Sequence, residues 1–165
     1  MHILVNNKYL TYKKYKVKCA VGKKGIGYKR KEGDYFTPIG VYRIKFVLYR
    51  KDRVKIKTNL KKKIIKKDLV WCDDPKSKQY NKLIKLPTTS SYEKLYKREN
   101  TYDIILVLNY NMNPTIKNKG SAIFIHIAKR NYKKTEGCIA LKKVHLLKIL
   151  KEIKNNTKVK IEVQK

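Results

Sequence analysis

The sequence predicts a mainly β, α+β fold in which strands outnumber helices. Three observations carry this prediction: several stretches alternate apolar and polar residues, two apolar runs are nearly continuous, and one apolar pattern has helical spacing. The chain has 165 residues, of which 42% are hydrophobic, with only 7 Gly and 4 Pro. We expect one domain over residues 1–165, because no linker, repeat or low-complexity tract divides the chain.

The alternating stretches predict strands with one buried face. They are Ile3–Val5, Tyr9–Tyr12, Val17–Val21, Val41–Phe46, Val54–Lys57 and Val159–Val163. Asn6 and Asn7, between the first two stretches, predict a hairpin turn. The runs Ile104–Leu108 and Ala122–Ile127 lack alternation, as expected of central strands covered on both faces.

Two helices are expected. Ser90 followed by Glu93 matches a capping box and predicts a short helix over residues 90–98. Apolar residues at helical spacing predict a second helix over residues 142–154, ended by Asn155 and Asn156. The second helix closely follows Cys138, so its N-terminal end is expected to add positive potential near that thiol.

The net charge of +31 is extreme, and lysine dominates it: only six of the 43 basic residues are Arg. Arg is the residue better suited to bidentate contacts with bases and phosphates, and no nucleic-acid motif accompanies the charge. We therefore expect no dedicated nucleic-acid partner. Loose electrostatic binding to anionic polymers remains open, with lysines on the solvent faces of strands.

The three cysteines, Cys19, Cys72 and Cys138, are odd in number and widely separated. This pattern predicts free thiols rather than a disulfide framework or a zinc site, so we expect no metal and no cofactor. The longest apolar runs fall well short of the roughly 20 residues that span a membrane, and the N-terminal residues lack the apolar core of a signal peptide. The chain is expected to be a soluble monomer.

His126 and Cys138 are the most informative pair. His126 lies near the end of an apolar run, and Cys138 follows Gly137. A thiol is a nucleophile only as thiolate, and a nearby imidazole can take its proton, so this pair suits acyl transfer. The competing interpretation is that the two never meet and that Cys138 is a small buried hydrophobe.

Two further blocks have structural and functional interpretations. Asp73 and Asp74 precede Pro75 beside an aromatic residue, which suits either cation or ammonium binding or a turn that caps its own backbone; we favour the turn. The block Thr37-Pro38-Ile39-Gly40 predicts a tight turn that leads into a strand.

Together these blocks resemble the L,D-transpeptidase (YkuD-like) catalytic domain, in particular its compact branch of stand-alone bacterial proteins. The resemblance covers most of the chain and depends on the order of the blocks at residues 22–27, 37–42, 71–75, 80–81, 102–111, 120–126 and 135–141. It implies a β-sandwich in which Cys138 attacks a peptide carbonyl and His126 is the general base. The family's usual reaction removes the terminal D-residue of a peptidoglycan tetrapeptide stem and passes the resulting thioester to an amine of a second stem. Hydrolysis of the thioester would give carboxypeptidase activity instead.

The resemblance also assigns further residues. Gly137 joins Cys138 and His126 in the catalytic set, since the backbone N–H groups of Gly137 and Cys138 are candidate oxyanion donors. The candidate substrate-binding residues are Tyr110, Asn111, Thr135, Asp74 and Tyr80. For Tyr110, a bond to substrate and support of its strand are equally open. The implied partner is a peptidoglycan stem peptide, and the implied location is the periplasm or cell envelope; with no signal peptide visible, the cytoplasm stays open.

Two residues depart from the best-known family pattern, which has His before the Gly-Cys pair and Asn or Arg two residues after the Cys. Here these positions hold Glu136 and Ala140. The departures leave two alternatives to catalysis: a binding module for polyanions or peptidoglycan, and a degenerate member that binds stem peptides without turnover.

Overall fold

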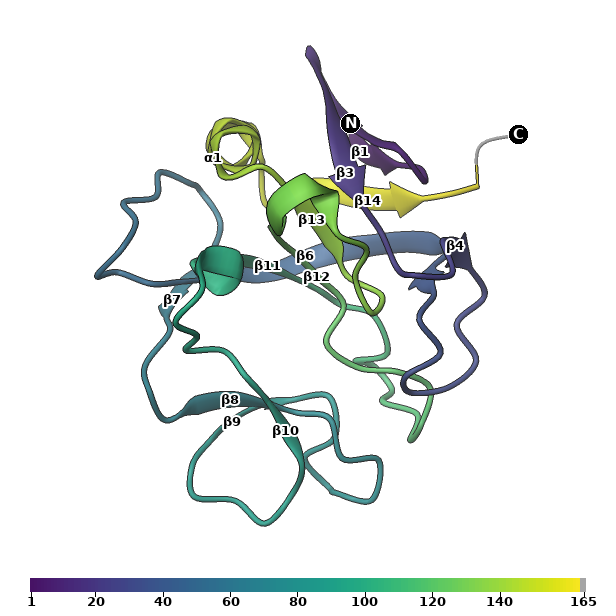
Figure 1. Cartoon of the computed structure of the whole chain (residues 1–165), viewed down its shortest axis with the longest axis vertical. Helices are drawn as coiled ribbons and strands as arrows, with labels where there is room; N and C mark the ends of the chain where they lie inside the picture. Colours follow the sequence, from purple (N-terminus) through teal and green to yellow (C-terminus); the bar gives the residue numbers. More distant parts are fainter. Residues whose placement is uncertain (164–165) are drawn as a thin grey trace.

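The computed structural model describes residues 1–163. Its strands and helices follow one another as shown in Figure 1. The strands are β1 (His2–Val5), β2 (Tyr9–Tyr12), β3 (Tyr15–Ala20), β4 (Ile26–Gly27), β5 (Thr37–Pro38), β6 (Gly40–Tyr49), β7 (Lys62–Ile64), β8 (Leu69–Cys72), β9 (Leu83–Lys85), β10 (Tyr92–Lys94), β11 (Ile104–Leu108), β12 (Phe124–Ile127), β13 (Ile139–Leu141) and β14 (Lys158–Ile161). The helices are α1 (Lys143–Glu152) and the 3-10 turns η1 (Asn100–Tyr102) and η2 (Arg130–Tyr132). The prediction of a β-rich α+β fold is confirmed.

Eight strands pair in a closed ring, in the order β11-β12-β13-β3-β2-β1-β14-β6, and β6 pairs again with β11. The long strand β6 closes the ring because its first four residues pair with β14 and its remainder pairs with β11. Strand β7 extends the sheet beyond β6. The predicted hairpin at Asn6 is confirmed, with its side-chain oxygen accepting the backbone N–H groups of Lys8 and Tyr9.

The ring has an apolar cluster on each side, which explains the continuous apolar runs. Along β11, Ile104, Leu106 and Leu108 point into the inner cluster, while Ile105 and Val107 join the outer one. Both faces of this strand are therefore buried, as the sequence predicted. The predicted C-terminal helix is also confirmed, since α1 packs on the inner cluster.

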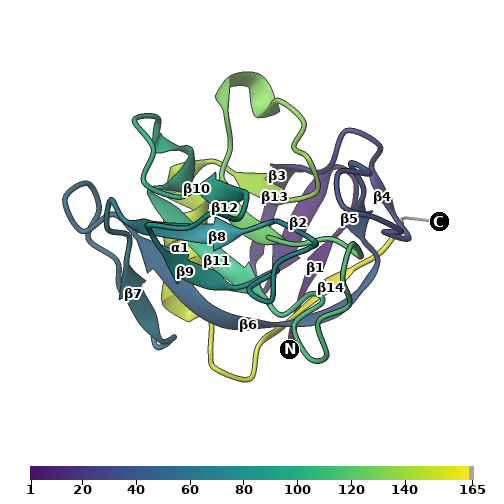
Figure 2. The same cartoon turned by 90° about the horizontal axis from the view of Figure 1, so that it is seen from below.

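A second, three-stranded sheet with the order β10-β8-β9 covers the outer cluster (Figures 1 and 2). Trp71 on β8 meets Phe124 on β12 edge to face, with 5.2 Å between ring centroids. This separate layer encloses one side of the candidate site. No helix within residues 1–163 is long and apolar enough to span a membrane.

Two predicted elements are wrong. Residues 92–94 form strand β10 on β8 instead of a helix, so the predicted cap residue Ser90 begins no helix. The capping box describes local hydrogen bonds only, and the backbone of this segment pairs with β8 instead. Residues 54–57 form no strand, since β7 occupies the edge of β6; Val54 is buried without joining a ladder.

Candidate active site

Strands β12 and β13 bring the imidazole of His126 and the thiol of Cys138 to one cleft. The two strands are parallel, and His126 pairs with Ala140. Cys138 lies two residues before Ala140, so its side chain projects from the same face of the sheet as that of His126. Both side chains line a cleft of about 430 Å³ on the outer face of the ring.

His126 is held as a neutral base. Its Nδ1 lies 2.9 Å from the carbonyl oxygen of Ile127, which can only accept, so Nδ1 carries the proton and Nε2 is the free acceptor. The pKa of the imidazole is lowered to about 4, mainly by burial; Lys97 and Lys129 add to the decrease and the Ile127 carbonyl opposes it. At neutral pH the ring is therefore uncharged.

Cys138 is held as a neutral thiol. Its Sγ donates to the carbonyl oxygen of Ala122 at 3.1 Å. Burial, with a smaller contribution from Glu93, raises the pKa of the thiol to about 12, although the backbone N–H of Phe124 and the ammonium groups of Lys29 and Lys97 act in the opposite direction. At neutral pH the cleft therefore holds a neutral thiol and a neutral imidazole.

Three polar side chains, those of Tyr102 on η1, Glu93 on β10 and Lys97, form a connected group next to the imidazole. The Tyr102 ring meets the His126 ring edge to face at 5.2 Å, and its hydroxyl donates to Glu93 at 2.6 Å. Lys97 pairs with the same carboxylate at 3.3 Å and lies over the Tyr102 ring. These three residues restrict the orientation of the imidazole.

The loop before Cys138 is shaped by hydrogen bonds rather than by the neighbouring helix. The Thr135 hydroxyl donates to the Cys138 carbonyl and accepts the Gly137 N–H at 3.2 Å. The Thr37 hydroxyl, from the predicted turn block, donates to the Gly137 carbonyl at 2.8 Å. Strand β13 lies between Cys138 and α1 along the chain, and α1 packs on the inner cluster whereas Cys138 packs on the outer one.

Of the predicted site residues, Cys138, His126, Gly137 and Thr135 line the cleft, and the other four do not. Asp74 accepts the Lys76 N–H and so caps its own turn, as favoured above. Tyr110 donates to the Lys119 carbonyl, and Asn111 holds the same loop through Ile116 and Gly120.

Tyr80 does not line the cleft but bonds to a residue that does. Its hydroxyl donates to Glu32, which lines the cleft, and accepts the Gly120 N–H at 3.0 Å. Like Tyr110 and Asn111, it supports the loop around Gly120 in this structure.

Sequence reasoning missed Asn81 as a positioning residue. Its side-chain oxygen accepts the Ala122 N–H and the Trp71 indole N–H, both at 3.1 Å, while its amide nitrogen donates to two carbonyls of the loop at Tyr110. Since the Ala122 carbonyl accepts the Cys138 thiol, Asn81 fixes the backbone that orients this thiol. The one signal in the sequence for this positioning role is that Asn81 follows Tyr80 in a block that resembles the family, residues 80–81.

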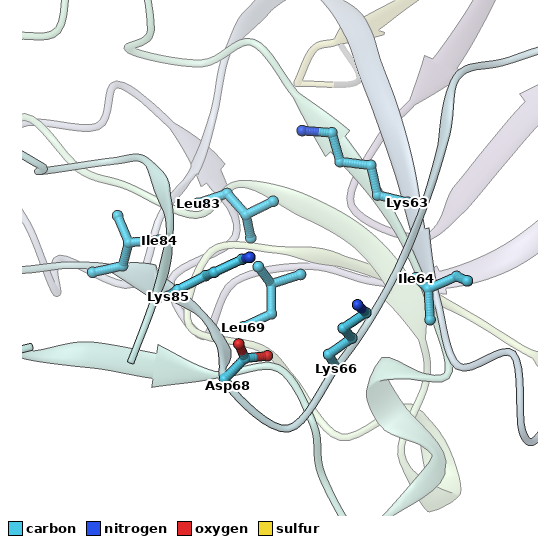
Figure 3. A pocket seen from close by; sticks show the side chains of 8 residues that line it. All are labelled: Lys63, Ile64, Lys66, Asp68, Leu69, Leu83, Ile84 and Lys85. Atoms are coloured by element: carbon cyan, nitrogen blue, oxygen red, sulfur yellow. The ribbon is translucent and has the colours of Figure 1, made fainter. Parts of the chain in front are cut away.

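A second hollow, of about 360 Å³, lies between β7 and the β8–β9 hairpin (Figure 3). It is lined by Lys63, Ile64, Lys66, Asp68, Leu69, Leu83, Ile84 and Lys85. This lining contains neither a thiol nor an imidazole, so it offers no acyl-transfer chemistry. Within residues 1–163 no cluster of His, Cys, Asp and Glu could hold a metal ion.

A closed β ring therefore carries a cysteine and a histidine in one cleft on its outer face, under a small second sheet. The sequence model of the L,D-transpeptidase (YkuD) catalytic domain matches residues 1–161, and the chain belongs to this family. No curated protein matches the chain. Family membership supports an acyltransferase with L,D-transpeptidase-type function on peptidoglycan and implies a cell-envelope enzyme.

Proposed function

We propose that this protein is a cysteine-dependent acyltransferase that acts on peptidoglycan stem peptides, with Cys138 as nucleophile and His126 as general base. The observation that carries the proposal is the placement of both side chains on one face of adjacent parallel strands, lining one cleft. The free Nε2 of a neutral imidazole is the atom that this chemistry requires.

In the first step the Cys138 sulfur attacks the carbonyl carbon that precedes the terminal D-residue, and the thiol proton passes to His126 Nε2. The Cys138 N–H is a candidate donor to the developing oxyanion, whereas the Gly137 N–H is already bound by Thr135. The imidazolium then protonates the leaving amine as the C–N bond breaks. The product is a thioester on Cys138.

In the second step an amine of another stem attacks the thioester. His126 takes a proton from that amine and returns one to the departing sulfur, so an amide forms and the thiol is restored. Water in place of the amine gives a free carboxylate, which is the carboxypeptidase outcome.

Mass spectrometry of the intact protein after incubation with tetrapeptide stems tests the proposal. We expect an adduct equal to the stem less its terminal residue, located on Cys138 and absent from Cys138→Ala. The variants Cys19→Ala and Cys72→Ala are the matched controls and should retain the adduct. No adduct, or an adduct shared equally among the three cysteines, would contradict the mechanism.

A second candidate is a binding role for anionic polymers, favoured by the net charge of +31 and by the second hollow. The ammonium groups of Lys63, Lys66 and Lys85 surround that hollow and form no ion pair within residues 1–163 (Figure 3).

Polyphosphate binding measured against salt tests this role. We expect the affinity for polyphosphate to fall steeply with salt and to be unchanged in Cys138→Ala. Replacing Lys63, Lys66 and Lys85 with Ser should lower the affinity more than the same replacement of Lys16, Lys18 and Lys45. Equal losses of affinity in the two triple variants would show that net charge alone causes the binding. Binding that is insensitive to salt or undetectable would exclude a binding role for anionic polymers.

A further inference from the structure

One buried cation lies beside the nucleophile without a role in the mechanism above. The Lys29 side chain is only 3% exposed, yet it lines the cleft. Most lysines of this chain lie at the surface, so the burial of this ammonium group calls for a reason.

Gly120 makes room for the Lys29 side chain, and Gly137 lies next to its ammonium group. A Cβ on Gly120 would lie 2.3 Å from Lys29 Cε, and a Cβ on Gly137 would lie 3.7 Å from Lys29 Nζ. Both glycines have positive φ, +101° and +143°, which other residues rarely adopt. The Lys29 ammonium is thereby placed next to the residue that precedes the nucleophile.

A dedicated carboxylate holds the ammonium in place. Asp34 Oδ1 accepts from Lys29 Nζ at 2.6 Å, and the Asp34 side chain also accepts the backbone N–H groups of Arg30, Lys31 and Phe36. Burial alone would raise the pKa of the Asp34 carboxyl, but these hydrogen bonds together lower it, so Asp34 stays ionised.

The pair with Asp34 uses one of the three N–H donors of the Lys29 ammonium. Within residues 1–163 no other acceptor binds Lys29 Nζ, so two donors of a buried cation remain for a ligand or water in the cleft. These two donors, together with the effect of the ammonium on the pKa of the Cys138 thiol, make Lys29 a candidate to bind an anion near the sulfur.

We propose that Lys29 binds a carboxylate of the acyl donor next to Cys138, and so selects stems that carry a free carboxylate close to the bond to be broken. This inference depends on the proposed function, because it takes Cys138 as the nucleophile. It adds a specificity-determining residue that lies outside the loop of residues 135–138.

Alkylation of Cys138 by iodoacetate and by iodoacetamide tests this role without turnover. In both reactions the sulfur forms a bond to the CH₂ carbon, iodide leaves, and the thiol proton passes to His126. The reagents differ by one negative charge next to the reacting carbon. The ratio of their rate constants at Cys138 therefore measures attraction of a carboxylate and cancels changes in the thiol itself.

The main variant is Lys29→Met combined with Asp34→Asn, which removes both charges and leaves no unpaired buried carboxylate. We expect the iodoacetate to iodoacetamide ratio to fall by about tenfold, because the reagent's carboxylate loses the ammonium donors that it would bind directly, although the local net charge is unchanged. Asp34→Asn alone should keep or raise the ratio, because the ammonium remains. Lys24→Met, an exposed lysine of the same segment outside the cleft, should change it by less than about twofold.

An unchanged ratio in the double variant, or equal slowing with both reagents, would overturn carboxylate binding by Lys29. A ratio that falls as much in Asp34→Asn alone would also overturn it, since disruption of the loop would then be the cause. Failure of wild-type Cys138 to react with either reagent would instead contradict the proposed function.

Discussion

Cys138 and Cys19 lie on neighbouring strands of one sheet but on opposite faces of it. Cys19 on β3 pairs with Leu141 on β13, and both point into the inner cluster. Cys138, just before β13, packs against the outer cluster and opens to the cleft. Burial raises the pKa of each thiol to about 12.

Because the pKa of the two thiols is raised to the same value, it does not distinguish the proposed nucleophile from Cys19. Both thiols are protonated at neutral pH, and only their surroundings distinguish them. Cys138 shares its face with a neutral imidazole and has two ammonium groups that oppose the effect of burial. Cys19 donates weakly to the Asn6 carbonyl at 3.6 Å, and burial is the one cause of its raised pKa.

The largest expected effect tests the difference between Cys138 and Cys19 directly. Cys138→Ala should lower stem-peptide turnover by at least about 10³-fold, because no other group forms the thioester. Cys19→Ala should leave turnover within about twofold and lower the free energy of unfolding by about 1 kcal/mol through lost burial. Turnover and urea unfolding measure the two effects. A comparable loss of turnover in both variants would refute the distinction between the faces.

The next effect concerns the base. His126→Gln keeps a polar side chain but removes the titratable nitrogen, so turnover should fall by about 10²- to 10⁴-fold. Alkylation of Cys138 by iodoacetamide at pH 7 should slow in the same variant, while labelling of unfolded protein should not change. Peptide mapping of the alkylated protein measures both. Unchanged alkylation of Cys138 would show that the imidazole does not assist the thiol.

Much of this site could be predicted from sequence, because local patterns report it. The alternation along β1–β3 and β6 and the continuous runs of β11 and β12 reflect which faces are buried, and the run of β12 carries His126. The helix predicted at residues 90–98 failed because a capping box describes local hydrogen bonds only. Whether those residues join β8 depends on a partner about 20 residues away.

The supporting residues could not be predicted from patterns. Lys29 and Asn81 acquire their roles from contacts with Gly120, Gly137 and Ala122, all far away in sequence. One lysine among many carries no signal that it is buried. The family resemblance assigns substrate contacts to Tyr80 and Asn111, whereas in this structure both bond to the loop at Gly120.

A smaller effect sharpens the comparison through pH. The imidazole on the outer face has a pKa near 4, below its ordinary value of 6.5, so the unfolded chain binds its proton first. Stability should be fully present above about pH 6.5 and fall by about 3 kcal/mol as pH decreases towards 4. Urea unfolding across this range measures it. His126→Gln should flatten the dependence, and Cys19→Ala should retain it; an unchanged slope in His126→Gln would contradict the buried neutral imidazole.

The smallest expected effect shows whether Tyr102 only positions the imidazole or takes part in the reaction. Tyr102→Phe keeps the ring that meets His126 but removes the hydroxyl that donates to Glu93. We expect a loss of about 1 kcal/mol in the free energy of unfolding and a decrease of a few-fold in turnover, since one hydrogen bond disappears while the base remains. The acid-dependent stability should keep its midpoint, because the imidazole stays buried. A loss of turnover as large as that of His126→Gln would instead place the Tyr102 hydroxyl in the reaction itself.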